Sequence, residues 1–226
     1  MMEGYATYTG TKRNQKALRL AGWRWIVTPD TLTRYAWRRP KWDDGTPAPY
    51  ALDNGAWGCF QRGEEWDEAN FLRSLRSVGV GADWVVLPDI VGAGLRSLER
   101  SLAWLPRIEG QVLLPVQDGM EVSDIAPHIG GRVGVFVGGS TEWKLATMHQ
   151  WCQLANRAGA TAHVGRVNTV RRIRQCSVAG AHSFDGTSCT RFAVNVPILD
   201  AARRRCTLFY PRVRAGSGQV QGSQNG

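Results

Sequence analysis

Three aspartates lie at the ends of short apolar runs, and their side chains could carry acid–base or nucleophilic chemistry. These are Asp53, Asp89 and Asp185. Two carboxyl groups at one site allow one to act as a nucleophile and the other as a general acid and base, as in retaining glycosidases. The residues therefore permit a reaction that begins with attack at the C1′ carbon of a sugar.

Two further segments carry groups that suit a nucleobase. Gln117 follows the run Val112–Val116, and the pair Gly138-Gly139 follows Val133–Val137. An aspartate and a glutamine can match the donor and acceptor edge of a guanine-like ring, and backbone groups at a Gly-Gly pair can approach an exocyclic atom. Each segment alone is more often a turn or a helix cap. The whole set, together with Arg166, is what points to chemistry.

The segments that must position these residues alternate between β-rich runs and helical patterns. Helical spacing covers residues 71–78 and 95–105, and Ser140 can cap a helix over residues 141–159. The β-rich runs start roughly twenty to thirty residues apart, which leaves room for the crossover helix that parallel strands require. They are Tyr5–Tyr8, Trp23–Thr28, Tyr50–Leu52, Trp84–Leu87, Val112–Val116, Val133–Val137, Ala162–Val167 and Ala181–Phe184. Eight such units predict an α/β fold, a compact (β/α)8 TIM-like barrel, with a doubly wound open parallel sheet as the alternative.

Length and composition fit one ordinary globular domain and exclude a disordered or collagen-like chain. The chain has 226 residues, of which 43% are hydrophobic and 21% charged. We expect a single barrel domain over residues 1–210 and a flexible tail over residues 211–226. No run approaches the roughly 18 apolar residues of a membrane span. We therefore expect a soluble protein without a membrane partner, in the cytoplasm, or in the host cytoplasm if a phage encodes it.

Positive charge is concentrated at both ends of the chain. Residues 1–42 carry nine basic and two acidic side chains, residues 43–160 carry nine and fifteen, and residues 161–226 carry ten and two, for a formal net charge of +9. If the fold is a closed barrel, the two basic ends become neighbours and form one face for a polyanion. The candidates for phosphate contacts or base stacking are Arg166, Arg171, Arg172, Arg174, Arg191, Trp37 and Trp42. For each arginine, a solvated helix face is an equally good explanation.

The five cysteines are scattered and contain no Cys-x-x-Cys pair. This pattern predicts neither a disulfide framework nor a zinc site, and it favours buried free thiols. We therefore expect no metal and no cofactor.

The ordered set of segments resembles the tRNA-guanine transglycosylase superfamily, and most closely its phage and bacterial DNA branch, the deoxypurine-in-DNA protein A family. The resemblance covers roughly residues 50–192. The family's Asp-Ser-Gly-Gly-Phe-Gln segment is similar to residues 53–58, its His-x-x-Gly-Val-Gly-like segment to residues 163–168, and its Phe-Asp-Cys nucleophile segment to residues 184–191. The chain lacks the Cys-rich zinc segment of the tRNA enzymes and leaves little room for a tRNA-binding domain. Both departures favour the DNA branch.

The resemblance implies a role for each candidate residue. Asp185 would be the nucleophile, Asp53 the general acid and base, and Asp89, Gln117 and Gly138-Gly139 the groups that recognise the base. The implied reaction exchanges guanine in DNA for a 7-deazaguanine base such as 7-cyano-7-deazaguanine (preQ0), with a covalent glycosyl-enzyme intermediate and no cofactor. Its partners would be DNA, the 7-deazaguanine base and other DNA-modification proteins.

Three other functions remain open from the sequence. The first is a tRNA-guanine transglycosylase. The second is a DNA glycosylase or nuclease of a defence system, and the third is a non-catalytic nucleic-acid-binding barrel. They differ in what they leave behind, which is modified tRNA, abasic sites or strand breaks, or unchanged nucleic acid.

Overall fold

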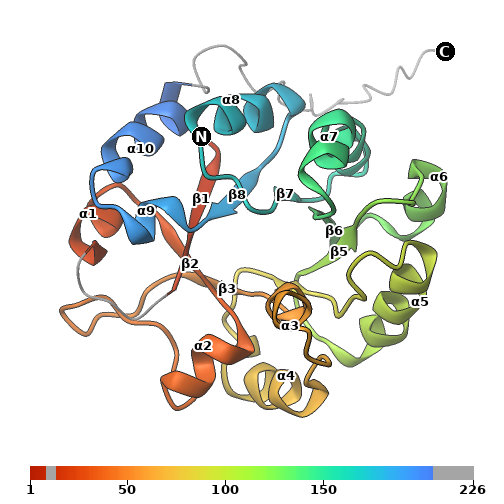
Figure 1. The fold of residues 1–226 in the computed structure, drawn as a ribbon, viewed down its shortest axis with the longest axis horizontal. Helices are drawn as coiled ribbons and strands as arrows, with labels where there is room; N and C mark the ends of the chain where they lie inside the picture. Colours follow the sequence, from red (N-terminus) through yellow and green to blue (C-terminus); the bar gives the residue numbers. More distant parts are fainter. Residues whose placement is uncertain (9–13, 206–226) are drawn as a thin grey trace, which may run out of the picture.

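Strands and helices alternate along the chain and close into a barrel of eight parallel strands, paired in sequence order (Figure 1). The structure is a computed structural model, which describes residues 1–8 and 14–205. The strands are β1 (Glu3–Thr7), β2 (Arg24–Val27), β3 (Tyr50–Leu52), β4 (Val85–Val86), β5 (Val112–Val116), β6 (Val133–Val137), β7 (Ala162–Val164) and β8 (Ser183–Gly186). The predicted (β/α)8 barrel is confirmed and the open sheet is excluded. The predicted tail, residues 211–226, lies outside the described residues.

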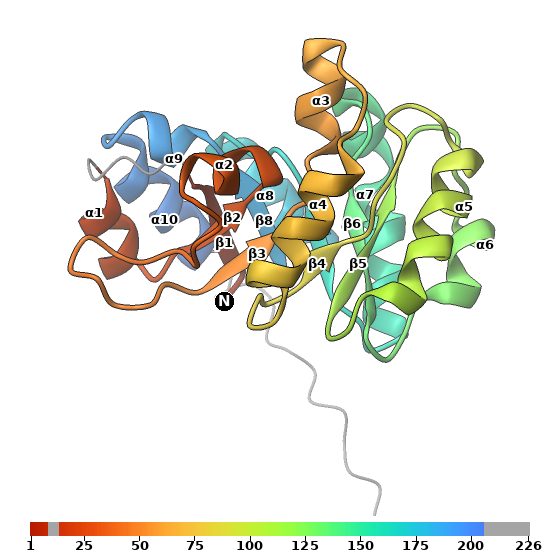
Figure 2. The same cartoon turned by 90° about the horizontal axis from the view of Figure 1, so that it is seen from below.

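Helices surround the barrel, and α3 extends furthest beyond the end of the barrel at which the strands finish (Figure 2). The α-helices are α1 (Gln15–Leu20), α2 (Pro29–Arg34), α3 (Ala56–Arg62), α4 (Glu68–Ser74), α5 (Leu95–Trp104), α6 (Val122–Ile125), α7 (Thr141–Arg157), α8 (Val170–Ala179), α9 (Ser188–Arg191) and α10 (Asn195–Arg205). A π-helical turn, Leu75–Gly79, extends α4, and 3-10 turns follow α5 (Leu105–Arg107) and α6 (Ala126–His128). No helix among the described residues is long and apolar enough to span a membrane.

Two strands, β7 and β8, end two or more residues from the predicted position. The predicted run to Val167 stops at Val164, because Arg166 adopts a left-handed backbone conformation with φ of 60°. The last strand begins later than predicted and continues through Asp185 to Gly186. Asp185 is therefore held on a strand and not on the loop that follows it. Ser140 caps α7 as predicted, and its hydroxyl accepts a hydrogen bond from the Trp143 N–H.

Closure of the barrel makes the two basic ends of the sequence neighbours. β1 pairs with β8, with Tyr5 opposite Asp185, and α10 packs against α8. A closed barrel was the condition for the two basic ends to form one face, and the structure meets this condition.

The hydrophobic core has two layers. Between strands and helices lies a large cluster that includes Trp23, Trp25 and Trp151. Inside the barrel lies a smaller cluster, which consists of Tyr5, Ile26, Ala51, Trp84, Val86 and Leu113, with Phe136 packed against it. Most tryptophans thus fill the core, and the barrel interior is packed with side chains, as expected for eight strands.

Arg203 joins the last helix to the beginning of the chain. Its side chain is 2% exposed, pairs with Asp200 (Nε to Oδ1, 2.7 Å), and donates to the carbonyl oxygens of Met2 (3.2 Å) and Ala21. Arg203→Met is expected to lower the free energy of unfolding by about 3 kcal/mol, because it leaves buried acceptors without a donor. Arg204→Met is the matched control, since Arg204 also pairs with Asp200 but is exposed, and it should cost less than about 1 kcal/mol. Denaturant titration of both variants measures the difference, and equal losses would contradict the role given to Arg203.

Candidate active site

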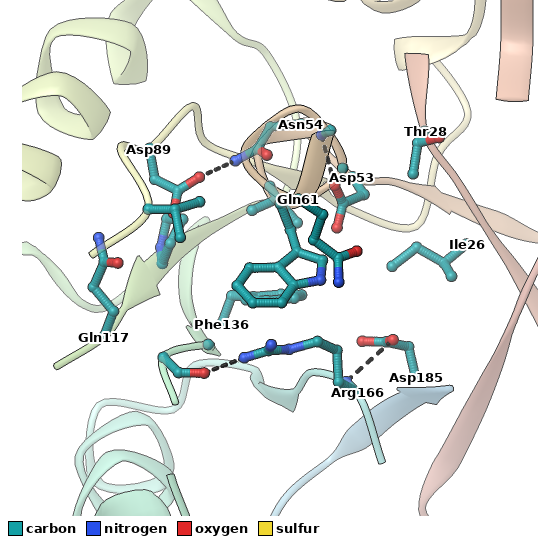
Figure 3. Close-up of a pocket in the computed structure, with 18 of the residues that line it drawn as sticks. Ile26, Thr28, Asp53, Asn54, Gln61, Asp89, Gln117, Phe136, Arg166 and Asp185 are labelled. Atoms are coloured by element: carbon teal, nitrogen blue, oxygen red, sulfur yellow. Dashed lines mark hydrogen bonds between the residues drawn. The ribbon is translucent and has the colours of Figure 1, made fainter. Parts of the chain in front are cut away.

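A cavity of about 660 Å³ opens at the carboxyl ends of the strands, where the fold brings most of the predicted site together (Figure 3). The predicted residues that line it are Asp53, Asp89, Gln117, Gly138, Gly139, Arg166, Asp185 and Arg191. They come from the ends of six strands and from α9. The catalytic and base-recognition candidates all belong to this group. Trp37, Trp42, Arg171, Arg172 and Arg174 do not line the cavity.

Asp185 receives a hydrogen-bond donor on each carboxylate oxygen. The His163 ring nitrogen Nε2 lies 3.0 Å from Oδ1, and the Arg166 backbone N–H donates to Oδ2 at 3.2 Å. The side chain is nearly buried yet lines the cavity. A carboxylate fixed on both oxygens is oriented, and its remaining lone pairs can attack a group placed in the cavity.

His163 holds Asp185 from inside the barrel. Burial lowers the pKa of His163, so the ring is neutral, and the acceptor-only carboxylate assigns its proton to Nε2. The other ring nitrogen lies 2.8 Å from the Ser183 hydroxyl, which can donate to it. The ring stacks on Phe136 and lies 4.6 Å, centroid to centroid, from Trp84. In the sequence, His163 stands out only as part of a motif. Its alternation with the apolar neighbours Ala162 and Val164 is the pattern that indicates an inward-facing position.

Asp53 lies where β3 turns into α3. Its Oδ1 accepts a hydrogen bond from the Gly55 N–H at 2.6 Å, and Gly55 has φ of 79°, a conformation that favours glycine. Burial raises the pKa of Asp53 to about 7; the Gly55 bond opposes the shift, and the nearby Asp185 and Asp89 add to it. A carboxyl group that titrates near neutral pH suits general acid and base catalysis.

Asp89 is tied to the same corner of the cavity through Asn54. The Asn54 amide donates to Asp89 Oδ1 at 2.8 Å (Figure 3). It also donates to the Leu87 carbonyl at 2.7 Å, and its oxygen accepts from the Ala56 N–H. Burial raises the pKa of Asp89 to about 6, and the Asn54 bond opposes this shift. The sequence does not predict this role of Asn54, because an Asp-Asn-Gly segment is also typical of an ordinary turn.

Gln117 is buried, and both ends of its amide bind the loop after β4. Its oxygen accepts from the Gly92 N–H at 2.6 Å, and its nitrogen donates to the Ile90 carbonyl at 2.8 Å. These bonds fix the loop beside Asp89. The amide nitrogen retains one N–H that the Ile90 bond does not use.

Gly138 and Gly139 form a close turn at the cavity wall. The Gly138 N–H donates to the Val116 carbonyl at 2.9 Å, and Gly139 has φ of 68°. A Cβ atom at Gly139 would lie 2.6 Å from Asp118 Oδ2 and 2.6 Å from the Trp143 ring. Asp118 in turn accepts from the Ser140 N–H and hydroxyl, both at 2.6 Å. The turn therefore requires glycine at position 139.

Arg166 and Trp57 cover part of the cavity and form a contact that the sequence did not predict. The guanidinium carbon lies 4.0 Å from the centroid of the Trp57 ring, and the side chain also donates to the Gly139 carbonyl. Trp57 extends from α3 and is 38% exposed. Trp57 lies in the segment 53–58, but nothing in that segment indicates a cationic partner more than a hundred residues away.

The remaining nucleic-acid candidates lie elsewhere. Arg171 and Arg174 line a separate groove between α7 and α8. Trp42 is 7% exposed and packs against Trp25 in the core, so the expectation that it stacks on a base was wrong. The Trp37 indole N–H donates to Asn70 Oδ1 at 3.3 Å, and the guanidinium of Arg73 lies 3.4 Å over its ring. One face of Trp37 is therefore already covered.

The cysteines that the structure describes, Cys59, Cys152, Cys176 and Cys189, are buried free thiols, as predicted. Cys206 lies outside the described residues. Within the described residues no group of three or more His, Cys, Asp or Glu side chains could hold a metal ion.

The cavity thus offers an oriented carboxylate, Asp185, and a second carboxyl group, Asp53, whose proton is exchangeable near neutral pH. Polar groups of Asp89, Gln117 and the Gly138-Gly139 turn surround the remaining wall. This arrangement can form and break a covalent bond to carbon with proton transfer to and from a leaving group. No protein-family model and no curated protein matches the sequence.

Proposed function

We propose that the protein is a DNA-guanine transglycosylase, which exchanges guanine in DNA for a 7-deazaguanine base such as 7-cyano-7-deazaguanine. The observation that carries the proposal is the pairing, in one cavity, of an oriented Asp185 with Asp53, whose pKa is raised to about 7. A retaining exchange at a sugar requires such a nucleophile and such an acid and base. The choice of guanine in DNA and of a 7-deazaguanine base as substrates rests on the resemblance to the transglycosylase superfamily.

The proposed reaction has two steps that use the same two residues. In the first, Asp185 attacks C1′, the bond from C1′ to N9 of guanine breaks, and Asp53 gives its proton to the departing guanine. In the second, Asp53 takes the proton from N9 of the incoming base, N9 attacks C1′, and the ester bond to Asp185 breaks. Both residues return to their starting states, and neither step needs a metal or a redox cofactor.

Base recognition is assigned to the opposite wall of the cavity. Asp89 would accept hydrogen bonds from the amino and ring N–H groups of a guanine-like base, and the backbone at Gly138-Gly139 would meet its exocyclic oxygen. Gln117 would contribute the N–H that it does not use for Ile90 and would hold the Ile90–Gly92 loop in place. An unpaired acceptor in a buried site discriminates strongly against a base without the matching donor.

DNA would approach the mouth from the side of Arg166 and Arg191, which line the cavity. The target guanine must leave the base stack to reach Asp185, so the substrate is either a flipped nucleotide or a single strand. Arg171, Arg172 and Arg174 on α8 remain candidates for phosphate contacts further along the strand. A DNA substrate places the proposed activity in the cytoplasm, with other DNA-modification proteins as further partners.

Incubation of the protein with labelled 7-cyano-7-deazaguanine and either DNA or tRNA tests the proposal. We expect label in the deoxynucleosides released by digestion, together with an equal amount of free guanine. Label in tRNA alone would identify the tRNA activity, and abasic sites or strand breaks without label would identify a glycosylase or nuclease. Nucleic-acid binding with neither base release nor label would identify a non-catalytic barrel.

A further inference from the structure

Lys144 is a buried cation that the proposed mechanism does not use. It lies near the start of α7, its side chain is 3% exposed, and its ammonium group donates to the carbonyl oxygen of Gly165. Among the described residues no carboxylate lies within salt-bridge distance of Lys144. Burial of an ammonium group without a paired carboxylate costs desolvation free energy, and other nearby groups must offset this cost.

The peptide that Lys144 binds also binds the nucleophile. Gly165 and Arg166 share one peptide group, whose carbonyl accepts from Lys144 and whose N–H donates to Asp185 Oδ2 at 3.2 Å. The next N–H, of Val167, donates to the Asp185 backbone carbonyl at 2.6 Å. One hydrogen-bonded chain therefore runs from the ammonium group through a single peptide to the carboxylate.

Local backbone geometry keeps this peptide close to Asp185. A Cβ atom at Gly165 would lie 2.9 Å from the Phe136 ring and 3.4 Å from Asp185 Oδ1, so only glycine allows the approach. Arg166 has φ of 60°, which is unfavourable for a residue with a side chain and turns its N–H toward the carboxylate. The strain is localised at the point where the chain meets Asp185.

We propose that Lys144 is a positioning residue for Asp185, which acts through the Gly165–Arg166 peptide. Its positive charge polarises the peptide, strengthens the N–H donor that faces Asp185, and compensates the negative charge of the carboxylate. The inference deepens the proposed function, on which it rests, since it assigns to Lys144 the support of the ionised nucleophile. A merely structural lysine would cap the carbonyl at the end of β7 without affecting Asp185.

The charged groups around Lys144 make its titration informative. The pKa of Lys144 is lowered to about 8, chiefly by burial and also by Arg166 and Arg172, while Asp185 and Cys176 oppose the shift. Lys144 is therefore charged below about pH 8 and neutral above it. The support that it gives to Asp185 should disappear over the same range.

The first experiment measures the rate of covalent adduct formation between the protein and DNA, without an incoming base, from pH 6 to pH 10. Lys144→Met should react about tenfold more slowly than the wild type at pH 7, and this difference should disappear above about pH 8, where the wild-type lysine loses its charge. The fall in rate that Asp53 causes near pH 7 is common to both proteins and cancels from their ratio. Lys144→Arg, which keeps its charge, should restore most of the rate at pH 7, and above about pH 8 the wild type should slow relative to it. Met148→Ala, one turn further along α7, controls for general destabilisation. If Lys144→Met matches Met148→Ala in rate and pH profile, the proposal is wrong.

The second experiment does not depend on catalysis. The effect of Lys144→Met on the equilibrium constant of unfolding is measured at pH 7 in the wild type and in an Asp185→Asn background. We expect Lys144→Met to raise the equilibrium constant of unfolding by a factor about five times larger in the wild type than in Asp185→Asn. The reason is that Asp185→Asn lacks the negative charge that the ammonium group compensates. Equal effects would overturn the proposal. The two proposals can fail separately. If the cycle shows coupling but the wild type exchanges no base, the proposed function is refuted, while the interaction between Lys144 and Asp185 stands.

Discussion

Asp185→Asn is expected to abolish base exchange, with a loss of about 10⁴-fold or more in rate. The amide cannot form the glycosyl ester, although it nearly matches the carboxylate in volume. It also has one acceptor oxygen, whereas Asp185 receives His163 on one oxygen and the Arg166 N–H on the other. The loss should appear in both steps of the reaction. Release of guanine, incorporation of labelled base and the denaturation-resistant protein–DNA adduct are the three measurements.

The controls separate loss of chemistry from loss of structure or binding. Asp185→Asn should bind DNA with nearly the wild-type affinity, because phosphate contacts are assigned to arginines at the mouth and not to Asp185. Asp124→Asn, on α6 and outside the cavity lining, should exchange base at the wild-type rate. Residual exchange by Asp185→Asn above a few per cent of wild type would remove Asp185 from the role of nucleophile.

The sequence predicts the barrel because its signals are periodic and repeated. Eight apolar runs alternate with helical patterns, and a parallel arrangement of such units closes when their number is eight. The same argument finds most of the site, since Asp53, Asp89 and Asp185 all follow or end strands that share one mouth. No contact between distant residues has to be known for this step.

Contacts that depend on side-chain direction are not predictable in this way. Gln117 could face either the cavity or the neighbouring loop, and its amide binds Ile90 and Gly92 because that loop folds back over it. His163 reaches Asp185 only through the register of β7 with β8, in which His163 lies opposite Ser183. Register between separate strands is a tertiary property.

Aromatic residues beside basic ones give a weak signal for nucleic-acid binding. Trp42 lies between Lys41 and Asp43 in a segment rich in arginine, yet its ring packs in the core. Trp57 has no basic residue beside it in sequence, and it is the tryptophan that meets Arg166 over the cavity. Burial follows from the packing of β2 and the loop after α2, which the local sequence does not specify.

Asp53→Asn is expected to slow base exchange by about 10²- to 10⁴-fold, the range typical of a lost general acid and base. The structural reason is the pKa of about 7, which leaves Asp53 partly protonated at neutral pH. Adduct formation needs the protonated form, which protonates the departing guanine, so its rate should fall as pH rises through about 7. Attack by the incoming base needs the ionised form, so its rate should rise through the same pH.

Opposite pH dependences with a common midpoint are therefore the signature of Asp53, and single-turnover measurements of the two steps test it. Asp53→Asn should remove both dependences.

The stability of the protein tests the pKa of Asp53 independently of the reaction. Between pH 3.8, its ordinary pKa, and about pH 7, the folded protein keeps the Asp53 proton, while the unfolded chain loses it. The free energy of unfolding of the wild type should thus fall relative to that of Asp53→Asn as pH rises through this window. Asp89, whose pKa is also raised, is present in both proteins, so its contribution largely cancels from the comparison. Parallel stability profiles would show that Asp53 titrates normally, and the assignment of Asp53 as acid and base would fail with them.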